Sequence, residues 1–584
     1  MNKFSRIIAL VLALVMVCAL AACGSGGSNS DDYEISWWIP VGEDASYYAE
    51  YEDNPVLKWI HDNKEFNGKH IQFDFVVGPP GAQADDWSRL VSVGDYMDIM
   101  DMSMPSMSVT EMYEEGMIWD LTELVPAHMP NLMKFLEENP QLQDYLYSYV
   151  NGEKRILQLR GFADAPTSNF QGFCYRRDWI AKYGTNPQTG AAFTYGYTDP
   201  ADKLTWYDDV VFPNGTDEPI YISDWEWMFD IFTKALAAEG IEDGYCYSVF
   251  YMGYMQTGDL YTGFGGGAPY WYIDGDTIKY GVTEDNMRAY LQCLNTWYNN
   301  GWLDKRFDEH TNDMFFAVDT SSVFQGKVGL WQGRTSTVGP QIQAEGTFSE
   351  DAMVFGCRQP INDVYGSDAQ QNKTPNFMYQ YTRYNSPCVL TDKMEEDEVI
   401  AILEFVDWLM TEEGWLLGNC GLNAEQVKGY ECAFTDTFGI SQGYYTAEGE
   451  GENLYVTPVI PLSASESPAT NLTRISLKYT VVNQVDPGVD RYVMQAYDAW
   501  DCYESTAAVP EKVMSSLSTD EAQEITKIRA SLDQFQQRTV PQMIKGEAYN
   551  VWDDASWSDF VKAINKYRAP RITEIYQTIL DSFS

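Results

Sequence analysis

The side chains that most often carry chemistry are few or scattered in this chain of 584 residues. It has 10 cysteines and 4 histidines, with no CxxC pair and no cysteine–histidine cluster, which argues against a zinc site. No GxSxG or HExxH signature is present. A glycoside hydrolase needs two carboxylates beside the scissile bond, but 86 acidic residues place some pair close together in any fold. We therefore expect no catalytic residue, no metal site and no cofactor.

One cysteine does have a specific chemical context, close to the N-terminus. A basic head and an apolar run, Ile7 to Leu20, precede the sequence Ala21-Ala22-Cys23-Gly24. The run has the length of a secretory signal, roughly 7–15 residues, and is short for a membrane span of roughly 20. The arrangement resembles a bacterial lipobox, which predicts removal of residues 1–22, lipidation of Cys23 and a flexible tether over 23–32. An ordinary signal peptide cut near Ala22 is the alternative.

Eight cysteines remain after Cys18 and Cys23 are set aside, and their redox state stays open. Cys420 and Cys432 are the closest in sequence and could pair in an oxidising compartment. Small buried hydrophobic side chains are the default interpretation. The eight are Cys174, Cys246, Cys293, Cys357, Cys388, Cys420, Cys432 and Cys502.

The chain is strongly acidic, and this limits its partners. Its formal charge of −48 becomes −50 once Lys3 and Arg6 leave with the signal, and no stretch gathers basic residues. Such a chain repels nucleic acid and anionic lipid. We expect a neutral or cationic ligand, and we expect the lipid on Cys23 to hold the protein at the membrane.

The first lobe begins with alternating strands and helices. Strands are predicted over 34–40, 71–77 and 98–100, with helices over 54–63 and 85–93. This order predicts an α/β fold with a parallel sheet and right-handed crossovers. Ligands bind beyond the carboxyl ends of such strands, which places Trp37, Trp38 and residues 101–104 near one rim.

Further elements follow along the chain. Ser223 to Glu226 reads as a capping box with Ser223 as the N-cap. Gly265-Gly266-Gly267 is followed by Ala-Pro rather than lysine or a helix, so a nucleotide-binding loop is not expected. The other predictions are a surface insertion over 185–221, helices over 283–300, 399–410, 519–537 and 557–567, and strands over 324–331 and 377–384.

Several short motifs occur in order along the chain. They are Gly94-Asp95-Tyr96-Met97-Asp98, Gly116 to Leu124, Tyr175-Arg176-Arg177-Asp178-Trp179, Thr283 to Asp304, Gly326-Lys327-Val328-Gly329, and Thr411 to Gly414 with Asn419 to Leu422. Taken in this order, they resemble the extracellular solute-binding proteins of family 1, the lipoprotein receptors of carbohydrate ABC importers. The resemblance covers residues 34–425, with Met97 replacing the usual proline of the first motif, while 185–221 and the part past 440 depart from the pattern.

The resemblance implies a two-lobed, periplasmic-binding-protein-like clamshell whose lobes are discontinuous. Lobe 1 would comprise 33–165 plus 382–440, and lobe 2 would comprise 166–381 plus 441–584, including a C-terminal helical extension. The chain would cross between lobes near 161–175 and 377–385.

Aromatic rings stack on sugar rings, and polar groups take the hydroxyls. The expected ligand-binding residues are Trp37, Trp38, Met102, Ser103, Tyr175, Tyr254, Phe264, Trp271, Trp331, Arg334, Tyr379 and Tyr381. Trp331 is the principal candidate, and Trp37 and Trp38 point to opposite faces of a strand, so at most one faces the ligand. Packing is the alternative for Tyr254, Phe264 and Trp271, and a structural ion pair is the alternative for Arg334.

The resulting hypothesis is a monomeric, lipid-anchored receptor on the extracellular face of the cell membrane. It would capture a carbohydrate, expected to be an oligosaccharide, and deliver it to the permease subunits of an ABC transporter. Two alternatives stay open: a peptide or lipopeptide receptor of an importer, and a glycan-binding surface lipoprotein without transport. No nucleic acid is expected as a partner.

Overall fold

The structure is a computed structural model of the whole chain. It describes residues 32–40, 55–79, 81–150, 152–162, 171–194, 209–249, 259–267, 270–309, 320–340, 342–346, 348–367, 387–428, 443, 445–448, 455–458, 491–500 and 508–583. Among these residues, no helix is both long and apolar enough to cross a membrane.

The chain forms two compact units, each assembled from separate stretches. Unit 1 contains residues 1–148, 154–164 and 384–485, and unit 2 contains 149–153, 165–383 and 486–584. The expected lobe boundaries differ at 441–485, which groups with unit 1 rather than lobe 2. The reason is visible in the hairpin of β12 (Tyr445–Glu448) and β13 (Tyr455–Pro458), because Tyr445 and Val456 enter the core of unit 1.

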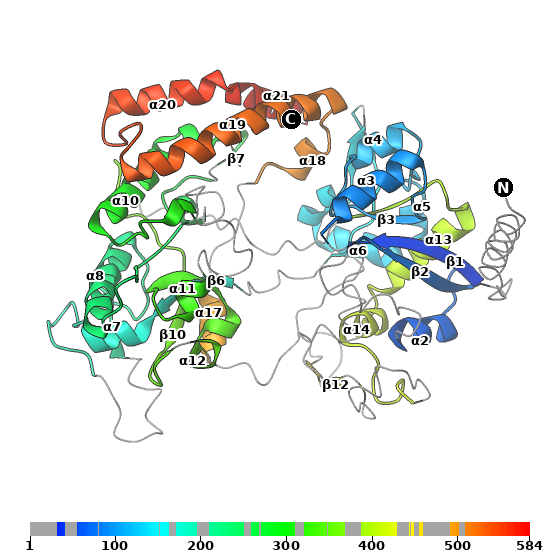
Figure 1. Cartoon of the computed structure of the whole chain (residues 1–584). Coiled ribbons are helices and arrows are strands. Elements are labelled where there is room, and N and C mark those ends of the chain that lie inside the picture. Colours follow the sequence, from blue (N-terminus) through cyan, green and yellow to red (C-terminus); the bar gives the residue numbers. More distant parts are fainter. Residues whose placement is uncertain are drawn as a thin grey trace, which may run out of the picture. The chain divides into compact units, whose positions relative to one another are not determined.

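A four-stranded sheet in the order β11-β3-β1-β2 forms the centre of unit 1 (Figure 1). Its strands are β1 (Asp32–Ile39), β2 (His70–Val77), β3 (Ile99–Asp101) and β11 (Cys388–Leu390). The first three are parallel, with Trp37 opposite Phe75 and Ile99, and β11 runs antiparallel to β3. The crossovers contain α2 (Pro55–Asn63) and α3 (Gln83–Val93). The predicted β-α-β-α-β order and the α/β fold class are confirmed.

The other described helices of unit 1 pack around this sheet. They are α4 (Val109–Glu114), α5 (Leu124–His128), α6 (Pro130–Glu138), η3 (Pro140–Tyr145), α13 (Glu396–Trp408) and α14 (Glu412–Cys420). The Asp407 carboxylate near the end of α13 accepts 2.9 Å hydrogen bonds from the Leu132 backbone N–H and the Asn131 amide. One buried carboxylate therefore joins α13 to the first turn of α6, although burial raises its pKa.

Unit 2 is built on an antiparallel sheet in the order β10-β6-β9. The strands are β6 (Gln171–Arg176), β9 (Leu330–Arg334) and β10 (Val354–Cys357). Helix α17 (Arg491–Trp500) covers one face closely, because a Cβ on Gly172 would lie 2.3 Å from Trp500 and one on Gly356 would lie 2.6 Å from Ala496. These two glycines are therefore required for the close approach of α17.

This part of unit 2 also contains four helices and a hairpin. The helices are α7 (Arg177–Tyr183), α8 (Ile222–Glu239), α9 (Asp259–Thr262) and α10 (Asp285–Asn300), and the hairpin is formed by β7 (Trp271–Asp274) and β8 (Thr277–Tyr280). Two local predictions are wrong. Residues Thr320–Phe324 form helix α11, so the strand expected over 324–331 begins only at Leu330. Helix α8 starts before Ser223, and its first turn is capped by Asp224, which accepts hydrogen bonds from the Ile220 and Tyr221 backbone N–H groups.

The C-terminal helices form a layer on unit 2, as Figure 1 shows for α19 (Thr519–Lys545), α20 (Asp554–Lys566) and α21 (Ala569–Asp581). Asn295 of α10 donates a 2.9 Å hydrogen bond to the Ile544 carbonyl, and Gln577 accepts one from the Ile278 N–H.

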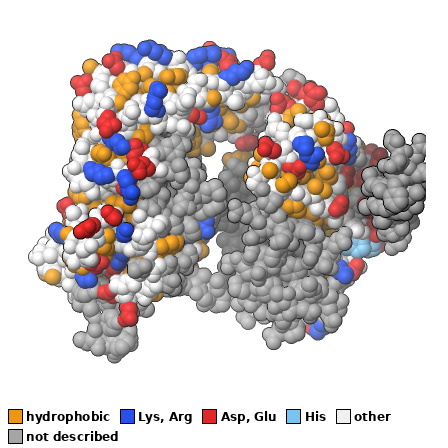
Figure 2. Space-filling model, in the orientation of Figure 1, with side chains coloured by type: hydrophobic (Ala, Val, Ile, Leu, Met, Phe, Trp, Pro, Cys, Tyr) orange, Lys and Arg blue, Asp and Glu red, His pale blue; other side chains and the backbone are white. Residues whose placement is uncertain are grey.

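Figure 2 shows lysine and arginine side chains over this layer, a local gathering that the linear sequence did not reveal. Exposed basic residues of this layer are Lys527, Arg529, Arg538, Lys562, Lys566 and Arg568.

Six cysteines lie in the described part of the chain, and all are buried free thiols. They are Cys174, Cys246, Cys293, Cys357, Cys388 and Cys420. Burial raises the pKa of Cys174 and of Cys246 to about 12. The interpretation as small buried hydrophobic side chains is confirmed for these six, and Cys432 and Cys502 lie outside the described residues.

Candidate functional site

In unit 2, the 245–249 segment, β9 and β10 run in the same direction, so their carboxyl ends lie at one edge of the sheet. Residues 245–249 run parallel to the chain entering β9, through the pairing of Tyr245 with Val328. β10 runs in the same direction as β9, because both are antiparallel to β6. In parallel α/β sheets, ligands bind beyond the carboxyl ends of the strands. The named strands of this sheet pair antiparallel, but the 245–249 segment, β9 and β10 all end at the same edge, and the loops that follow them gather there.

Two loops that follow these carboxyl ends meet at this edge. The Asn362 N–H, beyond β10, donates a 2.8 Å hydrogen bond to the carbonyl of Gly263, which lies beyond the 245–249 segment. Gln359 donates a 2.6 Å hydrogen bond to the Thr262 hydroxyl. Beside them is a cavity of about 240 Å³. It is lined by Phe264, Asp285, Asn286, Arg288, Ala289, Gln292, Asn362, Tyr365, Gly366 and Ser367.

Two aromatic rings, those of Phe264 and Tyr365, form the apolar part of this cavity, and both are held in place by other residues of unit 2. The Phe264 ring packs 5.4 Å from Tyr290 of α10. The Tyr365 hydroxyl and the Trp297 indole N–H both donate to the same oxygen of Glu226 in α8. Burial raises the pKa of Glu226. The rings are thus positioned before any ligand arrives.

The polar groups of the cavity fall into two sets. Arg288 and Gln292 are occupied, because both donate to the Val551 carbonyl, at 2.8 and 3.0 Å, and Arg288 also binds Asp554. Within the part of the chain that the structure describes, the side chains of Asp285, Asn286 and Ser367 have no hydrogen-bond partner. This second set offers a carboxylate, an amide and a hydroxyl at the mouth of an aromatic cavity.

A glycine closes the remaining wall. Gly366 has φ +78°, and a Cβ there would lie 2.9 Å from the Cβ of Ala289. Its loop is held by the Asn362 amide, which accepts from the Tyr365 N–H and donates to the Tyr365 carbonyl. The loop can approach α10 only because residue 366 lacks a side chain.

The Gly265-Gly266-Gly267 run next to Phe264 is a packing feature. A Cβ on Gly266 would lie 2.2 Å from Tyr261, and one on Gly267 would lie 2.1 Å from Tyr272. Both tyrosine hydroxyls donate to Glu284, at the start of α10. The glycines are therefore explained by two buried rings and not by a phosphate.

A second cavity of similar size, about 250 Å³, lies at the opposite edge of the same sheet. There Arg177 donates to the Tyr175 hydroxyl and to the carbonyls of Asp217 and Val210. Gln495 both donates to and accepts from the backbone of Gly356. Its lining residues are Arg177, Asp217, Glu218, Phe355, Arg491, Tyr492 and Gln495.

In unit 1, the expected ligand tryptophans are core residues. Trp37 and Trp38 are both 0% exposed, although they lie on opposite faces of β1. Trp37 packs against Phe73 and Phe75, and Trp38 donates a 3.1 Å hydrogen bond to Asp86 of α3. At most one of them was expected to face the ligand, and both side chains are buried because β1 is a central strand covered on both faces.

Met102 and Ser103 follow the carboxyl end of β3, as the sequence predicted. Met102 is buried, and its N–H donates to the Pro387 carbonyl. Ser103 is exposed, with its N–H donating to the Asp101 carboxylate at 2.8 Å. Of these two, only Ser103 presents its side chain at the surface.

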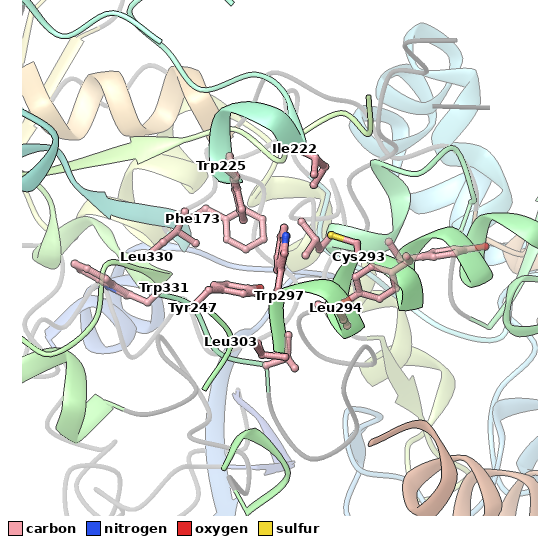
Figure 3. Close-up of a cluster of buried hydrophobic side chains, with 14 of the residues drawn as sticks. Phe173, Ile222, Trp225, Tyr247, Cys293, Leu294, Trp297, Leu303, Leu330 and Trp331 are labelled. Atoms are coloured by element: carbon pink, nitrogen blue, oxygen red, sulfur yellow. The ribbon is translucent and has the colours of Figure 1, made fainter. Parts of the chain in front are cut away.

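Trp331, the principal candidate, is 4% exposed and belongs to the core of unit 2 shown in part in Figure 3. Its indole nitrogen would lie 2.7 Å from a Cβ on Gly333, so the ring extends along β9 toward the carboxyl end. Arg334 is half-buried at the last position of that strand. These residues lie at the carboxyl edge. Trp331 is buried to the same extent as Phe264, and the two differ in that Phe264 lines the cavity described above and Trp331 does not.

Two further candidates lie away from the carboxyl edge. The Tyr175 ring is buried, and its hydroxyl accepts from Arg177 at the opposite edge. Trp271 stacks on Tyr280 at 4.2 Å and donates to Thr573 of α21, so it serves packing against the C-terminal layer. Of the unit 2 candidates, Phe264 alone lines a described cavity.

Tyr254, Tyr379, Tyr381 and the lipidation candidate Cys23 lie outside the described residues. The sequence reasoning missed Asp285, Asn286, Tyr365 and Ser367. The start of the helix near Thr283 was visible in the sequence, but the return of residues 362–367 to that helix depends on long-range contacts that no local pattern shows.

The chain was also compared with known proteins. No family model and no curated protein sequence matches it. Solved structures do match across nearly the whole chain. An HMO-binding, ABC-transporter-associated solute-binding protein from Bifidobacterium longum infantis has a TM-score of 0.62 at 13% identity, covering 94% of this chain and 99% of the other.

Two more structures give the same result. An extracellular solute-binding protein from Bifidobacterium longum subsp. infantis has a TM-score of 0.64 at 12% identity, covering 94% of this chain and 98% of the other. An ABC-transporter substrate-binding protein from S. pneumoniae, solved with kestose, has a TM-score of 0.60 at 14% identity, covering 94% and 99%. The chain therefore has the α/β fold of these solute-binding proteins.

Proposed function

We propose that this chain is the extracellular solute-binding component of an ABC importer and that it captures a neutral oligosaccharide. The observation that carries the proposal is the cavity at the carboxyl edge of unit 2. It combines two fixed aromatic rings with three polar side chains that have no partner among the described residues. Aromatic faces and unpaired hydrogen-bonding groups are what a pyranose or furanose ring requires.

The charges of the cavity favour a neutral ligand over an anionic one. Asp285 contributes an exposed carboxylate, and the only cation among the lining residues, Arg288, is bound to Asp554. The formal charge of −48 adds a repulsive field for anions. A uronate or a phosphorylated sugar would therefore enter less readily than a neutral one.

The fold and the N-terminal sequence support the proposal that the chain works beside an ABC permease at the cell surface. The three solved structures compared above are solute-binding or substrate-binding proteins, and one was solved in complex with kestose. Lipidation of Cys23 would keep such a receptor beside its permease. Labelling cells with an alkyne-bearing fatty acid should mark the wild-type protein, and Cys23→Ala should release it unlabelled into the medium.

The function is tested by ligand screening with the chain lacking residues 1–23. Neutral malto-, cello-, xylo- and fructo-oligosaccharides and short peptides would be compared by thermal unfolding and calorimetry. A ligand at a 100-fold excess over Kd stabilises by about 2.7 kcal/mol, which is readily measured as a rise in Tm. Stabilisation by a saccharide, left chemically intact, supports the proposal. Stabilisation by peptides alone would replace it with a peptide receptor.

A further inference from the structure

One large aromatic side chain stands outside the cavity yet is fixed in place. Trp552, in the turn between α19 and α20, is 53% exposed. Its indole N–H donates a 2.9 Å hydrogen bond to the Asn295 side chain of α10. A tryptophan that is half in solvent and also held by a buried partner is preorganised to contact something else.

The turn that carries Trp552 is anchored to the cavity itself. The Val551 carbonyl, one residue earlier, accepts from two lining side chains, Arg288 and Gln292. The Trp552 ring centroid is 6.5 Å from that of Tyr365, a third lining residue. Trp552 therefore stands at the rim of this cavity.

The backbone of the turn is also unusual. Tyr549 has φ +35°, a left-handed conformation uncommon for a bulky residue, and its ring packs 5.5 Å from Phe560. The Asn550 side chain accepts from the Trp552 N–H at 2.9 Å. An uncommon backbone conformation is thus maintained by packing, in the turn that presents the tryptophan to solvent.

The size of the cavity limits how much of a ligand it can hold. A volume of about 240 Å³ is below the roughly 300–1,000 Å³ of most small-molecule sites, so it holds little more than one sugar ring. The rest of an oligosaccharide must lie outside the cavity. Among the described residues, Trp552 is the exposed aromatic side chain that adjoins it there.

We propose that Trp552 is a stacking platform for a second sugar residue, so that the site selects ligands of at least two sugar units. This inference rests on the proposed function and extends it to the length of the ligand. Asp285, Asn286 and Ser367 would bind the hydroxyls of the residue in the cavity, and Trp552 would take the apolar face of its neighbour.

The experiment compares Trp552→Ala with wild type across malto-, cello-, xylo- and fructo-oligosaccharides of one to five units. In the wild type, affinity should rise from one unit to two or three. The variant should lose about 3- to 10-fold of that rise while its affinity for the single sugar is unchanged, and Trp552→Phe should recover part of it. Val93→Ala, at a residue 66% exposed in unit 1, is the matched control and should change nothing.

A spectroscopic readout separates contact from indirect effects. With 5-fluorotryptophan incorporated, the ¹⁹F resonance missing from Trp552→Phe is that of Trp552, and it should shift when a disaccharide saturates the protein. Unchanged length dependence in Trp552→Ala, or an unmoved resonance, would overturn the platform while leaving the proposed function intact. A wild type that binds no saccharide of any length would overturn both.

Discussion

The two cavities of unit 2 lie at opposite edges of one sheet and are nearly equal in volume, at about 240 and 250 Å³. Each contains aromatic rings, arginine, acid and amide groups. At the edge where β6 ends, Arg177 and Gln495 already bind the protein itself. At the carboxyl edge, Arg288 and Gln292 are likewise bound, but Asp285, Asn286 and Ser367 bind no other described group, whereas the other cavity has one such side chain among the described residues, Asp217. Composition and volume therefore do not separate a structural cavity from a binding one, and the two cavities differ in how many of their polar side chains lack a partner.

The largest expected effect comes from a substitution in the cavity that Arg177 lines, at the edge where β6 ends. Arg177→Ala would leave the buried Tyr175 hydroxyl and the Val210 carbonyl without their donor and remove a guanidinium 4.5 Å from the Phe355 ring. We expect a loss of about 3–5 kcal/mol in the free energy of unfolding. Denaturant titration measures it.

The same variant tests the assignment of roles. Saccharide affinity of the folded fraction should be unchanged, and Arg177→Lys, which keeps the charge but not the planar fork, should fall between wild type and Arg177→Ala in stability. A stable Arg177→Ala protein with weakened saccharide binding would reverse the roles given to the two cavities.

A smaller effect on stability, with an effect on binding, is expected at the carboxyl edge. Gly366→Ala places a Cβ against Ala289 at a residue with φ +78°. The strain should cost about 1–2 kcal/mol and push the Tyr365 loop away from α10, lowering saccharide affinity. Gly275→Ala, which has a similar φ of +61° but open space around it, is the control. Equal affinities in the two variants would show that the wall at 366 does not shape the site.

The smallest effect concerns the charge behind Tyr365. Burial raises the pKa of Glu226, so the folded protein binds its proton more tightly than the unfolded chain does. Stability from this group is fully present below the unfolded pKa of about 4.3 and is lost as the pH rises through the raised folded value. Glu226→Gln keeps an acceptor oxygen. Its free energy of unfolding, relative to that of wild type, should therefore be higher at pH 7.5 than at pH 4.

Urea unfolding at the two pH values measures this difference. Saccharide affinity should hardly change in Glu226→Gln, because the Tyr365 hydroxyl keeps an acceptor, whereas Glu226→Ala should weaken it. If the stabilities of wild type and Glu226→Gln run parallel with pH, the buried charge has no energetic consequence.

Local patterns predicted much of the fold but little of the site. The strands at 34–40 and 71–77 were visible because alternation and terminal prolines are local signals. The strand expected from Phe324 begins later, because helix α11 extends to Phe324 and a turn with Gly326 at φ +71° separates it from β9, which starts at Leu330.

The site residues depend on contacts between distant segments. Trp37 and Trp38 looked like ligand residues by type, yet helix packing on both faces of β1 buries them. Tyr365 and Trp552 carry no local signal, since Tyr365 is placed by Glu226 and Trp552 by Asn295. Residue type indicates which chemistry is possible, and tertiary contacts decide which side chains remain available.

The central claim is that the carboxyl-edge cavity of unit 2 binds a neutral oligosaccharide. The most direct measurement is calorimetric titration of the tightest-binding saccharide into wild type and into the Asp285→Ala/Asn286→Ala double variant. Both residues lie at the surface end of α10, so the fold should persist. We predict a loss of affinity of 10-fold or more, and an affinity equal to that of wild type would contradict the account.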